Sequence, residues 1–212
     1  MPEINFDHLQ DYLTSLVPPR EPVLQEMEAY AEKNNFPALG PVCGYYCYQL
    51  ARMMRATSVF ELGSGYGYST AWFAKAVREN GGGVVHHTVW DDKLSAMAQE
   101  YLTKLGYSDL VKFHNAEAVA TLRQTPGAFD IIFNDIDKEG YPDSLPTIKS
   151  KLRSGGLLII DNMIWHGQIL DADDHEESTE AIRRFTHDVT TDSDWIVSLT
   201  PIRDGMIVAY KK

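Results

Sequence analysis

The fold is decided by the stretch Phe60-Glu61-Leu62-Gly63-Ser64-Gly65-Tyr66-Gly67-Tyr68-Ser69, which joins a short apolar run to a helical pattern. The run at 58–62 predicts a strand, and residues 68–79 predict a helix. Glycines in the intervening turn permit positive φ and let a ligand approach the backbone closely. The N-terminus of the following helix offers free N–H groups to an anion, and a carboxylate group of a bound ligand would suit this position. A plain strand-to-helix turn or an NAD site would share this pattern.

Two details separate this glycine loop from a dinucleotide site. Gly67 comes one residue too early for the G-x-G-x-x-G fingerprint. Glu61 lies two residues before Gly63, where its carboxylate would repel a pyrophosphate but would suit an ammonium group or a ribose hydroxyl. S-adenosylmethionine has a sulfonium, an ammonium and no phosphate. The loop therefore favours S-adenosylmethionine, with NAD as the alternative.

Strands and helices alternate outward from this loop. Further strands are predicted at 84–90, 111–114, 129–133 and 157–160, helices at 94–105, 117–122, 141–152 and 179–189, and a closing antiparallel pair at 195–199 and 206–210. This order predicts an α/β fold: a doubly wound, mostly parallel, seven-stranded, Rossmann-like sheet with helices on both faces. Residues 1–55 predict extra N-terminal helices. We expect one domain over 1–212, with a core at 56–212 that binds cofactor and metal.

Composition excludes several classes of protein. The 212 residues are 44% hydrophobic and 23% charged, which suits a globular domain rather than a disordered chain. The net charge of −11 and the lack of a Lys/Arg-rich run disfavour a nucleic-acid partner. The start, MPEINFDHLQ, lacks the features of a signal peptide. No apolar run approaches the roughly 18 residues of a membrane span, so we expect a cytoplasmic protein. Cys43 and Cys47 are expected to be reduced, half-buried thiols.

Two acids follow the second and third strands. An acid at the end of the second strand would hydrogen-bond a ribose, which makes Asp91 the candidate, with Trp90 packed on the adenine. Glu117, or the backbone at Ala118, would reach the adenine amino group. A helix N-cap is an equally good interpretation of each acid.

Acidic residues also follow the fourth and fifth strands. Asp135 ends the fourth strand, and Asp161-Asn162 end the fifth. Both strands lie beside the first in the doubly wound order, so these three side chains converge next to the glycine loop. Three oxygen ligands suit Mg²⁺, with Mn²⁺ or Ca²⁺ as alternatives. Successive strand residues point to opposite faces, so Asp161 and Asn162 can both bind only if the chain turns there. Solvated acids or helix caps are the alternative interpretation.

Lys138 lies one turn beyond Asp135. It could serve as the general base for a hydroxyl whose oxygen the metal already polarises. Methyl transfer from sulfur to oxygen would then depend mainly on positioning. An exposed lysine without a role is the alternative.

At these residues the sequence resembles the cation-dependent O-methyltransferases, the caffeoyl-CoA and catechol O-methyltransferase family with its bacterial members. The resemblance covers nearly the whole chain. The motifs that carry it are Pro19-Arg20-Glu21-Pro22-Val23-Leu24, Gly44, Glu61-Leu62-Gly63, Gly67-Tyr68-Ser69, Asp135-Ile136-Asp137-Lys138 with Tyr141, Gly155-Gly156, Asp161-Asn162, Trp165-His166-Gly167 and Asp204-Gly205.

The resemblance implies a function for these positions. It implies that Asp135, Asp161 and Asn162 bind the metal and that Lys138 is the base. The positions that it implies for S-adenosylmethionine are Glu61, Gly63, Ser64, Gly65, Ser69, Glu117, Ala118, Asp135 and Asp137. It also implies a class I methyltransferase fold, a homodimer and a small acceptor with vicinal hydroxyls on an aromatic ring.

The sequence departs from the family pattern at three places. The ribose-binding acid of relatives falls near Val89, so Asp91 requires a small register shift. Asn134 replaces the apolar residue usual before the metal-binding aspartate. The variable loop at 168–180 is rich in acids, whereas the phosphates of a CoA ester would prefer Lys or Arg. A free catechol or a caffeate-like phenol is therefore expected rather than a CoA thioester.

Overall fold

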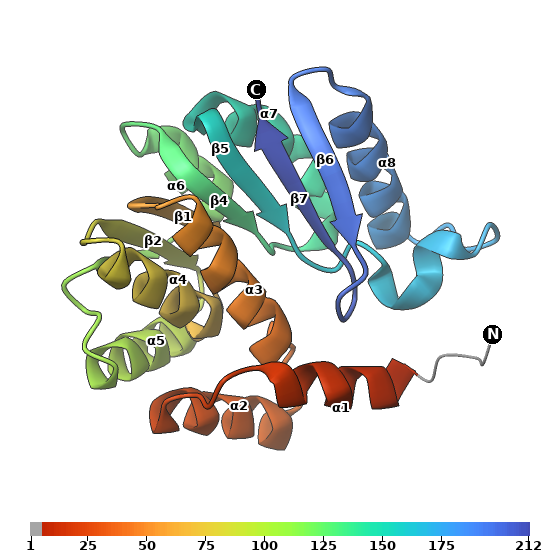
Figure 1. Ribbon diagram of the computed structural model, residues 1–212. Coiled ribbons are helices and arrows are strands. Elements are labelled where there is room, and N and C mark those ends of the chain that lie inside the picture. The colour runs from red at the N-terminus through yellow and green to blue at the C-terminus, as the bar shows by residue number, and fades with distance from the viewer. Residues whose placement is uncertain (1–5) are drawn as a thin grey trace.

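The computed structural model describes residues 6–212 (Figure 1). Residues 1–5 lie outside the described residues, and they include the first half of the segment on which the prediction about a signal peptide rests. The helices are α1 (Phe6–Leu16), α2 (Pro22–Asn34), α3 (Gly40–Met53), α4 (Tyr68–Glu79), α5 (Asp92–Lys104), α6 (Ala118–Gln124), α7 (Tyr141–Lys151) and α8 (Glu177–Thr191), with short 3-10 helices η1 (Lys138–Gly140) and η2 (Trp165–Leu170). The strands are β1 (Ser58–Leu62), β2 (Val84–Val89), β3 (Val111–Asn115), β4 (Phe129–Asn134), β5 (Leu152–Ile160), β6 (Trp195–Thr200) and β7 (Met206–Lys211).

The seven strands form one sheet in the order β3-β2-β1-β4-β5-β7-β6. The pairs among β1 to β5 are parallel, and β7 runs antiparallel to both β5 and β6. This confirms the predicted doubly wound sheet and its closing antiparallel pair. The main difference from the predicted elements is β5, which begins at Leu152 rather than Leu157. It pairs with β4 on both sides of a register shift, first Leu152 with Phe129 and then Leu157 with Ile131.

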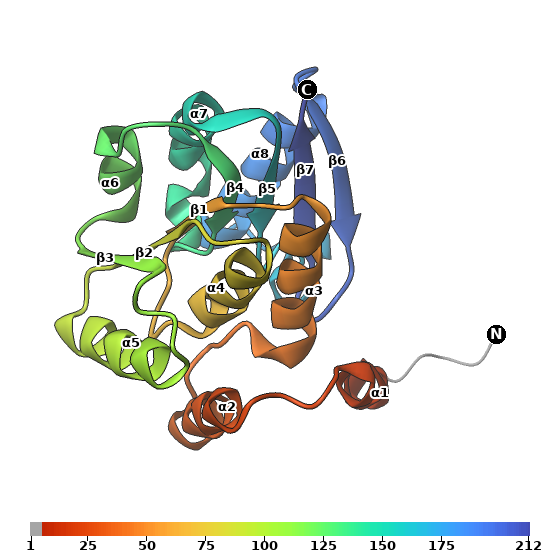
Figure 2. The same cartoon turned by 60° about the vertical axis from the view of Figure 1, so that its left-hand side comes forward.

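Two apolar layers cover the sheet, one on each face. Alternate strand residues point to opposite faces, so Val59 packs with α2 to α5 while Phe60 packs with α6 to α8. Ile131 and Ile132 divide between the same two layers. Figure 2 shows α3, α4 and α5 on one side of the sheet and α6, α7 and α8 on the other.

The N-terminal helices lie beneath the arrowheads of β4 and β5 in Figure 1. Side chains of α2 and of the two residues before it hold α2 against α4. Arg20 makes a bidentate ion pair with Glu28, whose carboxylate also accepts the Tyr68 hydroxyl at 2.7 Å. Glu21 pairs with Lys75 at 2.6 Å. Bidentate arginine pairs fix geometry as well as adding energy, so these contacts set where α2 sits over the end of the sheet.

Two further expectations concern the cysteines and membranes. Cys43 and Cys47 are free, as expected, but they are fully rather than half buried, because both lie on the face of α3 that packs into the core. Burial raises the pKa of the Cys43 thiol to about 12. Across residues 6–212, none of the helices has the length and hydropathy needed to cross a membrane.

Gly63 is the point at which β1 passes close to β4. Its φ is +81°, and a Cβ there would overlap the carbonyl oxygen of Asp135. Gly127 has a similar φ of +95°, but a Cβ there would meet nothing within 4 Å. The two positions therefore separate backbone strain from steric overlap.

We expect Gly63→Ala to lower the free energy of unfolding by about 2 kcal/mol more than Gly127→Ala, because only the first adds an overlap to the strain. Denaturant titration of both variants measures the difference. Equal losses would mean that the close approach of Gly63 to β4 has no energetic consequence.

Candidate active site

The site begins with the register of three parallel strands. Leu62 of β1 pairs with Asn134 of β4, and Asn134 pairs in turn with Ile160 of β5. The residues that follow these three therefore leave the sheet at one edge, side by side. They are Gly63, Asp135 and Asp161, which the sequence placed next to one another.

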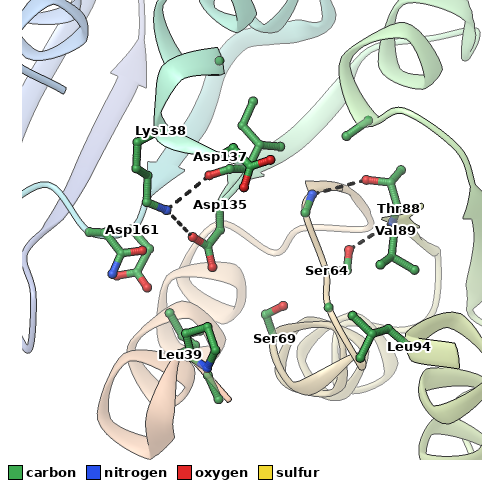
Figure 3. Close-up of a pocket in the computed structure, with 18 of the residues that line it drawn as sticks. Leu39, Ser64, Ser69, Thr88, Val89, Leu94, Asp135, Asp137, Lys138 and Asp161 are labelled. Carbon is green, nitrogen blue, oxygen red and sulfur yellow. Dashed lines mark hydrogen bonds and ion pairs between the residues drawn. The ribbon is translucent and has the colours of Figure 1, made fainter. Parts of the chain in front are cut away.

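A cavity of about 750 Å³ opens at this edge. That volume lies within the range of small-molecule sites. Figure 3 shows Lys138, Asp135 and Asp161 on one side of the cavity and Thr88, Val89 and Leu94 on the other. The loop between α2 and α3, residues 36–39, contributes a further wall, which the sequence analysis did not predict.

The glycine loop is tied to the end of β2. The Ser64 amide donates to the Thr88 carbonyl at 2.9 Å, and the Ser64 hydroxyl accepts the Thr88 amide at 3.0 Å. The Thr88 hydroxyl donates to the Glu61 carbonyl at 2.6 Å. These bonds hold Gly63, Ser64 and Gly65 at the cavity surface, together with Ser69 from the first turn of α4.

Glu61 lies fully buried behind this loop and does not itself line the cavity. Burial raises the pKa of its carboxyl group to about 7, and the hydroxyls of Ser69, Thr70 and Ser64 oppose that shift. Neither carboxylate oxygen has a hydrogen-bond partner of good geometry among the described residues. A buried acid without partners is costly, so it needs a ligand or a functional explanation.

Asp91 and Glu117 both act as helix N-caps. The Asp91 carboxylate accepts the amides of Lys93 and Leu94, and Asp91 lies outside the cavity lining. Glu117 caps α6 in the same way but also lines the cavity, next to Ala118. The cap interpretation therefore holds for both acids, and a ribose contact of Asp91 stays a prediction. Trp90, which was expected to pack on the adenine, lines the cavity and is 74% exposed.

Asp135, Asp161 and Asn162 all line the other end of the cavity. Asn162 has a φ of +59°, which is the turn that both residues need in order to face one site. Asp161 is 1% exposed, and its Oδ1 has no hydrogen-bond partner in the described chain. Burial and the nearby charge of Asp135 raise the pKa of Asp161.

Across residues 6–212, no group of three or more His, Cys, Asp or Glu side chains is arranged to hold a metal ion. The expected set is of another kind, because it combines two carboxylates with one amide. Each carboxylate is paired with a cation: Asp135 with Lys138 at 2.8 Å, and Asp161 with Arg203 at 3.4 Å.

Lys138 is buried, which excludes the interpretation as an exposed lysine. Its ammonium donates to Asp135 Oδ1 at 2.8 Å, to the Ile136 carbonyl at 3.2 Å and to the Tyr141 hydroxyl at 2.9 Å. It also lies over the rings of Tyr141 and Trp165. Tyr141 in turn donates to the Asp161 carbonyl at 3.1 Å. Lys138 is therefore held in one position between the two acids.

Asp137, the residue before Lys138, is exposed and also lines the cavity. It lies outside the contacts that hold the lysine, so its expected place beside the cofactor stays a prediction.

Two contributors were missed by reasoning from the sequence. Asp204 is buried, and its carboxylate accepts hydrogen bonds from the side-chain amide of Asn162 at 3.1 Å and from the backbone N–H of His166 at 2.6 Å. Arg203 lines the cavity beside it. The signal was the pair Asp204-Gly205, one of the motifs of the family resemblance, to which no role was assigned. Asn134, which departs from the family pattern, lies buried and donates to the Ser144 hydroxyl at 3.1 Å.

Comparisons with known proteins identify the family and the fold. A family model described as O-methyltransferase matches residues 18–212. The catechol O-methyltransferase of Niastella koreensis is 30% identical over 186 residues, covering 85% of this chain and 83% of that protein.

Two solved structures share the fold. The O-methyltransferase of Bacillus cereus superposes with a TM-score of 0.87 at 24% identity, covering 97% of both chains. The O-methyltransferase TomG of Streptomyces achromogenes superposes with a TM-score of 0.86 at 24% identity, covering 97% of this chain and 96% of TomG. The expected class I fold and enzyme class are thereby confirmed, and the chain belongs to the O-methyltransferase family.

Proposed function

We propose that the chain transfers a methyl group from S-adenosylmethionine to a hydroxyl of a small catechol-like or phenolic acceptor, with help from a divalent cation. One observation carries the proposal. Two carboxylates, an amide and a buried lysine converge at one end of a cavity whose other end is a glycine loop. A cofactor and an acceptor could thus meet inside one enclosure.

The cofactor assignment is supported by the glycine loop and by related structures. The Bacillus cereus protein was solved with S-adenosylhomocysteine and the Streptomyces protein with S-adenosylmethionine. In this chain, the Glu61 carboxylate lies directly beneath the loop with unmet hydrogen-bonding capacity. A cationic ligand above it would offset the cost of a buried negative charge.

The donor set fits a hard divalent cation such as Mg²⁺. Asp161 Oδ1 is an unpartnered buried oxygen, and Asp204 takes the Asn162 amide nitrogen, which leaves the Asn162 oxygen for a ligand. Asp135, Asp161 and Asn162 would hold the ion. When bound, it would polarise an acceptor oxygen as a Lewis acid.

Lys138 is assigned to accept the proton of the acceptor hydroxyl, and it does so as the neutral amine, after releasing to solvent one of the three protons that it donates in the ligand-free protein. The S–CH₃ bond breaks as the O–CH₃ bond forms, which yields S-adenosylhomocysteine and a methyl ether. Asp135 stabilises the lysine as it becomes an ammonium, and Tyr141 fixes its direction. The remaining contribution is orientation, since holding reactants in line lowers the barrier substantially.

The catechol-like acceptor is supported by the name of the Niastella relative, catechol O-methyltransferase. A catechol has two hydroxyl groups on neighbouring ring carbons and so offers two oxygens to one ion. The acidic segment at 168–180 argues against the phosphates of a CoA ester. The homodimer and the lack of a nucleic-acid partner stay predictions.

Chelation tests the metal role. We expect EDTA to abolish methylation of caffeate and simple catechols by labelled S-adenosylmethionine, and added Mg²⁺ or Mn²⁺ to restore it. Activity that is indifferent to chelation would remove the metal from the proposal. Tight cofactor binding without turnover on a broad phenol panel would instead favour a non-catalytic binding protein.

Substitution tests the assigned residues. We expect Lys138→Ala to lower kcat by roughly 10²–10⁴-fold, the range of a lost general base. Asp135→Ala, which removes a proposed metal ligand, should also lower kcat, while S-adenosylmethionine still binds to both variants in calorimetry. The exposed Lys93 supplies the control, because Lys93→Ala should leave kcat unchanged. A fully active Lys138→Ala would contradict its role as base.

Glu61 predicts a pH dependence of stability in the ligand-free protein. Its folded pKa of about 7 exceeds the ordinary value of 4.5, so the folded state holds a proton that the unfolded state releases. The contribution of Glu61 therefore falls as the pH rises from about 4.5 to 7. We expect Glu61→Gln to match wild type near pH 4.5 and to exceed it by up to about 3 kcal/mol above pH 7.

Denaturant titrations between pH 4.5 and 8 measure this difference, and Glu32→Gln, which changes an exposed acid on α2, is the control. A difference that stays constant with pH, or that grows toward low pH, would contradict a buried Glu61 of raised pKa. The Glu61→Gln variant should also bind S-adenosylmethionine more weakly, because the cationic ligand no longer has the negative charge of the Glu61 carboxylate beneath it.

A further inference from the structure

Arg203 occupies an unusual position at the cavity. It lies in the connection between β6 and β7, and its φ is +51°, a left-handed conformation that is uncommon for a residue other than glycine, asparagine or aspartate. The next residue, Asp204, is the buried acid that holds Asn162. The strained backbone therefore brings a guanidinium to the wall of the cavity beside the proposed metal ligands. Strain of this kind is often retained at functional sites.

The guanidinium has hydrogen-bonding capacity to spare. Arginine offers five N–H donors, yet within residues 6–212 Arg203 makes one side-chain hydrogen bond, to Asp161 Oδ2 at the long distance of 3.4 Å. About a third of its side chain is exposed. Lys138, the other lysine or arginine that lines the cavity in the described chain, already donates to three acceptors. Arg203 is thus the lining cation that can bind an incoming anion.

The charge balance changes when the proposed cation binds. Asp161 is the one acid that pairs with Arg203 in the described chain, and it is also a proposed metal ligand. If the Asp161 carboxylate binds the metal ion, its negative charge is offset by that ion, and the Arg203 guanidinium loses its counter-charge. An anionic group on the acceptor would supply one, and a carboxylate matches the planar fork of arginine in a bidentate way.

The surroundings limit that anion to a single charge. Arg203 also borders a second hollow, whose walls include the exposed acid Glu32. This acid would repel a group that carries several negative charges, such as a phosphate ester, more than a group with one charge. Trp165 and Phe36 line the main cavity and can pack against an aromatic ring. One carboxylate on a ring therefore fits this end of the cavity better than a phosphate chain.

We propose that Arg203 binds the carboxylate of the acceptor, so that the enzyme prefers catechols that carry a carboxylate over uncharged catechols. This inference rests on the proposed methyl transfer and names the class of its substrate. Arg203 is then a specificity-determining residue rather than a participant in proton or methyl transfer.

The test compares two acceptors that differ only in charge: protocatechuate and its uncharged primary amide. Wild type, Arg203→Asn, Arg203→Lys and the control Arg55→Asn are assayed with Mg²⁺ and S-adenosylmethionine. Asparagine tolerates positive φ, so the variant should fold. Arg55 is a matched control because it is exposed, has a φ of +50° and lies outside the cavity lining.

We expect Arg203→Asn to lower kcat/KM by about 10- to 100-fold for protocatechuate, the effect of losing a charged hydrogen bond, and by less than about 3-fold for the amide. Arg203→Lys should recover part of the loss, and Arg55→Asn should change neither. Calorimetric titration of protocatechuate into protein with S-adenosylhomocysteine and Mg²⁺ should show the same loss of affinity without turnover.

Equal losses for both acceptors would overturn the proposal, because Arg203 would then act through Asp161 and the metal. An unchanged preference for protocatechuate in Arg203→Asn would overturn it as well. A wild type that methylates both acceptors equally would leave the methyl transfer standing and remove only the role of Arg203. A wild type that methylates neither acceptor nor any other catechol would contradict the proposed function itself.

Discussion

The structure depends on the in-register pairing of β1, β4 and β5 at their carboxyl ends. Backbone hydrogen bonds place Leu62, Asn134 and Ile160 in one row, so that the next residue of each strand leaves the sheet at the same level. A shift of one residue in either pairing would turn every side chain of that strand to the other face. The glycine loop and the two carboxylates would then no longer meet.

Two acids next to that row, Glu61 and Asp161, are removed from solvent. Their burial raises the pKa of each. Lys138 and Arg203 offset part of this charge through pairs with Asp135 and Asp161. The proposed cationic cofactor and divalent ion would offset the rest, so the buried charge that costs stability would favour the binding of both.

The sequence predicted this arrangement well where signals are local. The apolar run before Gly63 and the helical pattern after it gave the bounds of β1 and α4 as the structure has them. Asp91 and Glu117 show the limit of local signals, because an acid at the start of a helix caps it whether or not it also reaches a ligand. The role of Asp204 could not be predicted from local signals, because its contact with Asn162 spans 42 positions and exists only when β7 inserts beside β5.

The insertion of β7 beside β5 places the connection between β6 and β7 against the segment that follows β5. The Met163 and Ile164 amides donate to the carbonyls of Gly205 and Asp204 at 2.9 and 2.7 Å, which joins the segment after β5 to the β6–β7 connection. Asp204 orients the Asn162 side chain from that connection, and Arg203 extends from the adjacent position into the cavity. Both residues depend on the same connection, so a change in its backbone would displace Asp204 and Arg203 together, whereas a change in the Arg203 side chain alone leaves the contact between Asp204 and Asn162 in place. If the proposed ion and acceptor bind as inferred, the connection between β6 and β7 would help to position both, through two separate side chains.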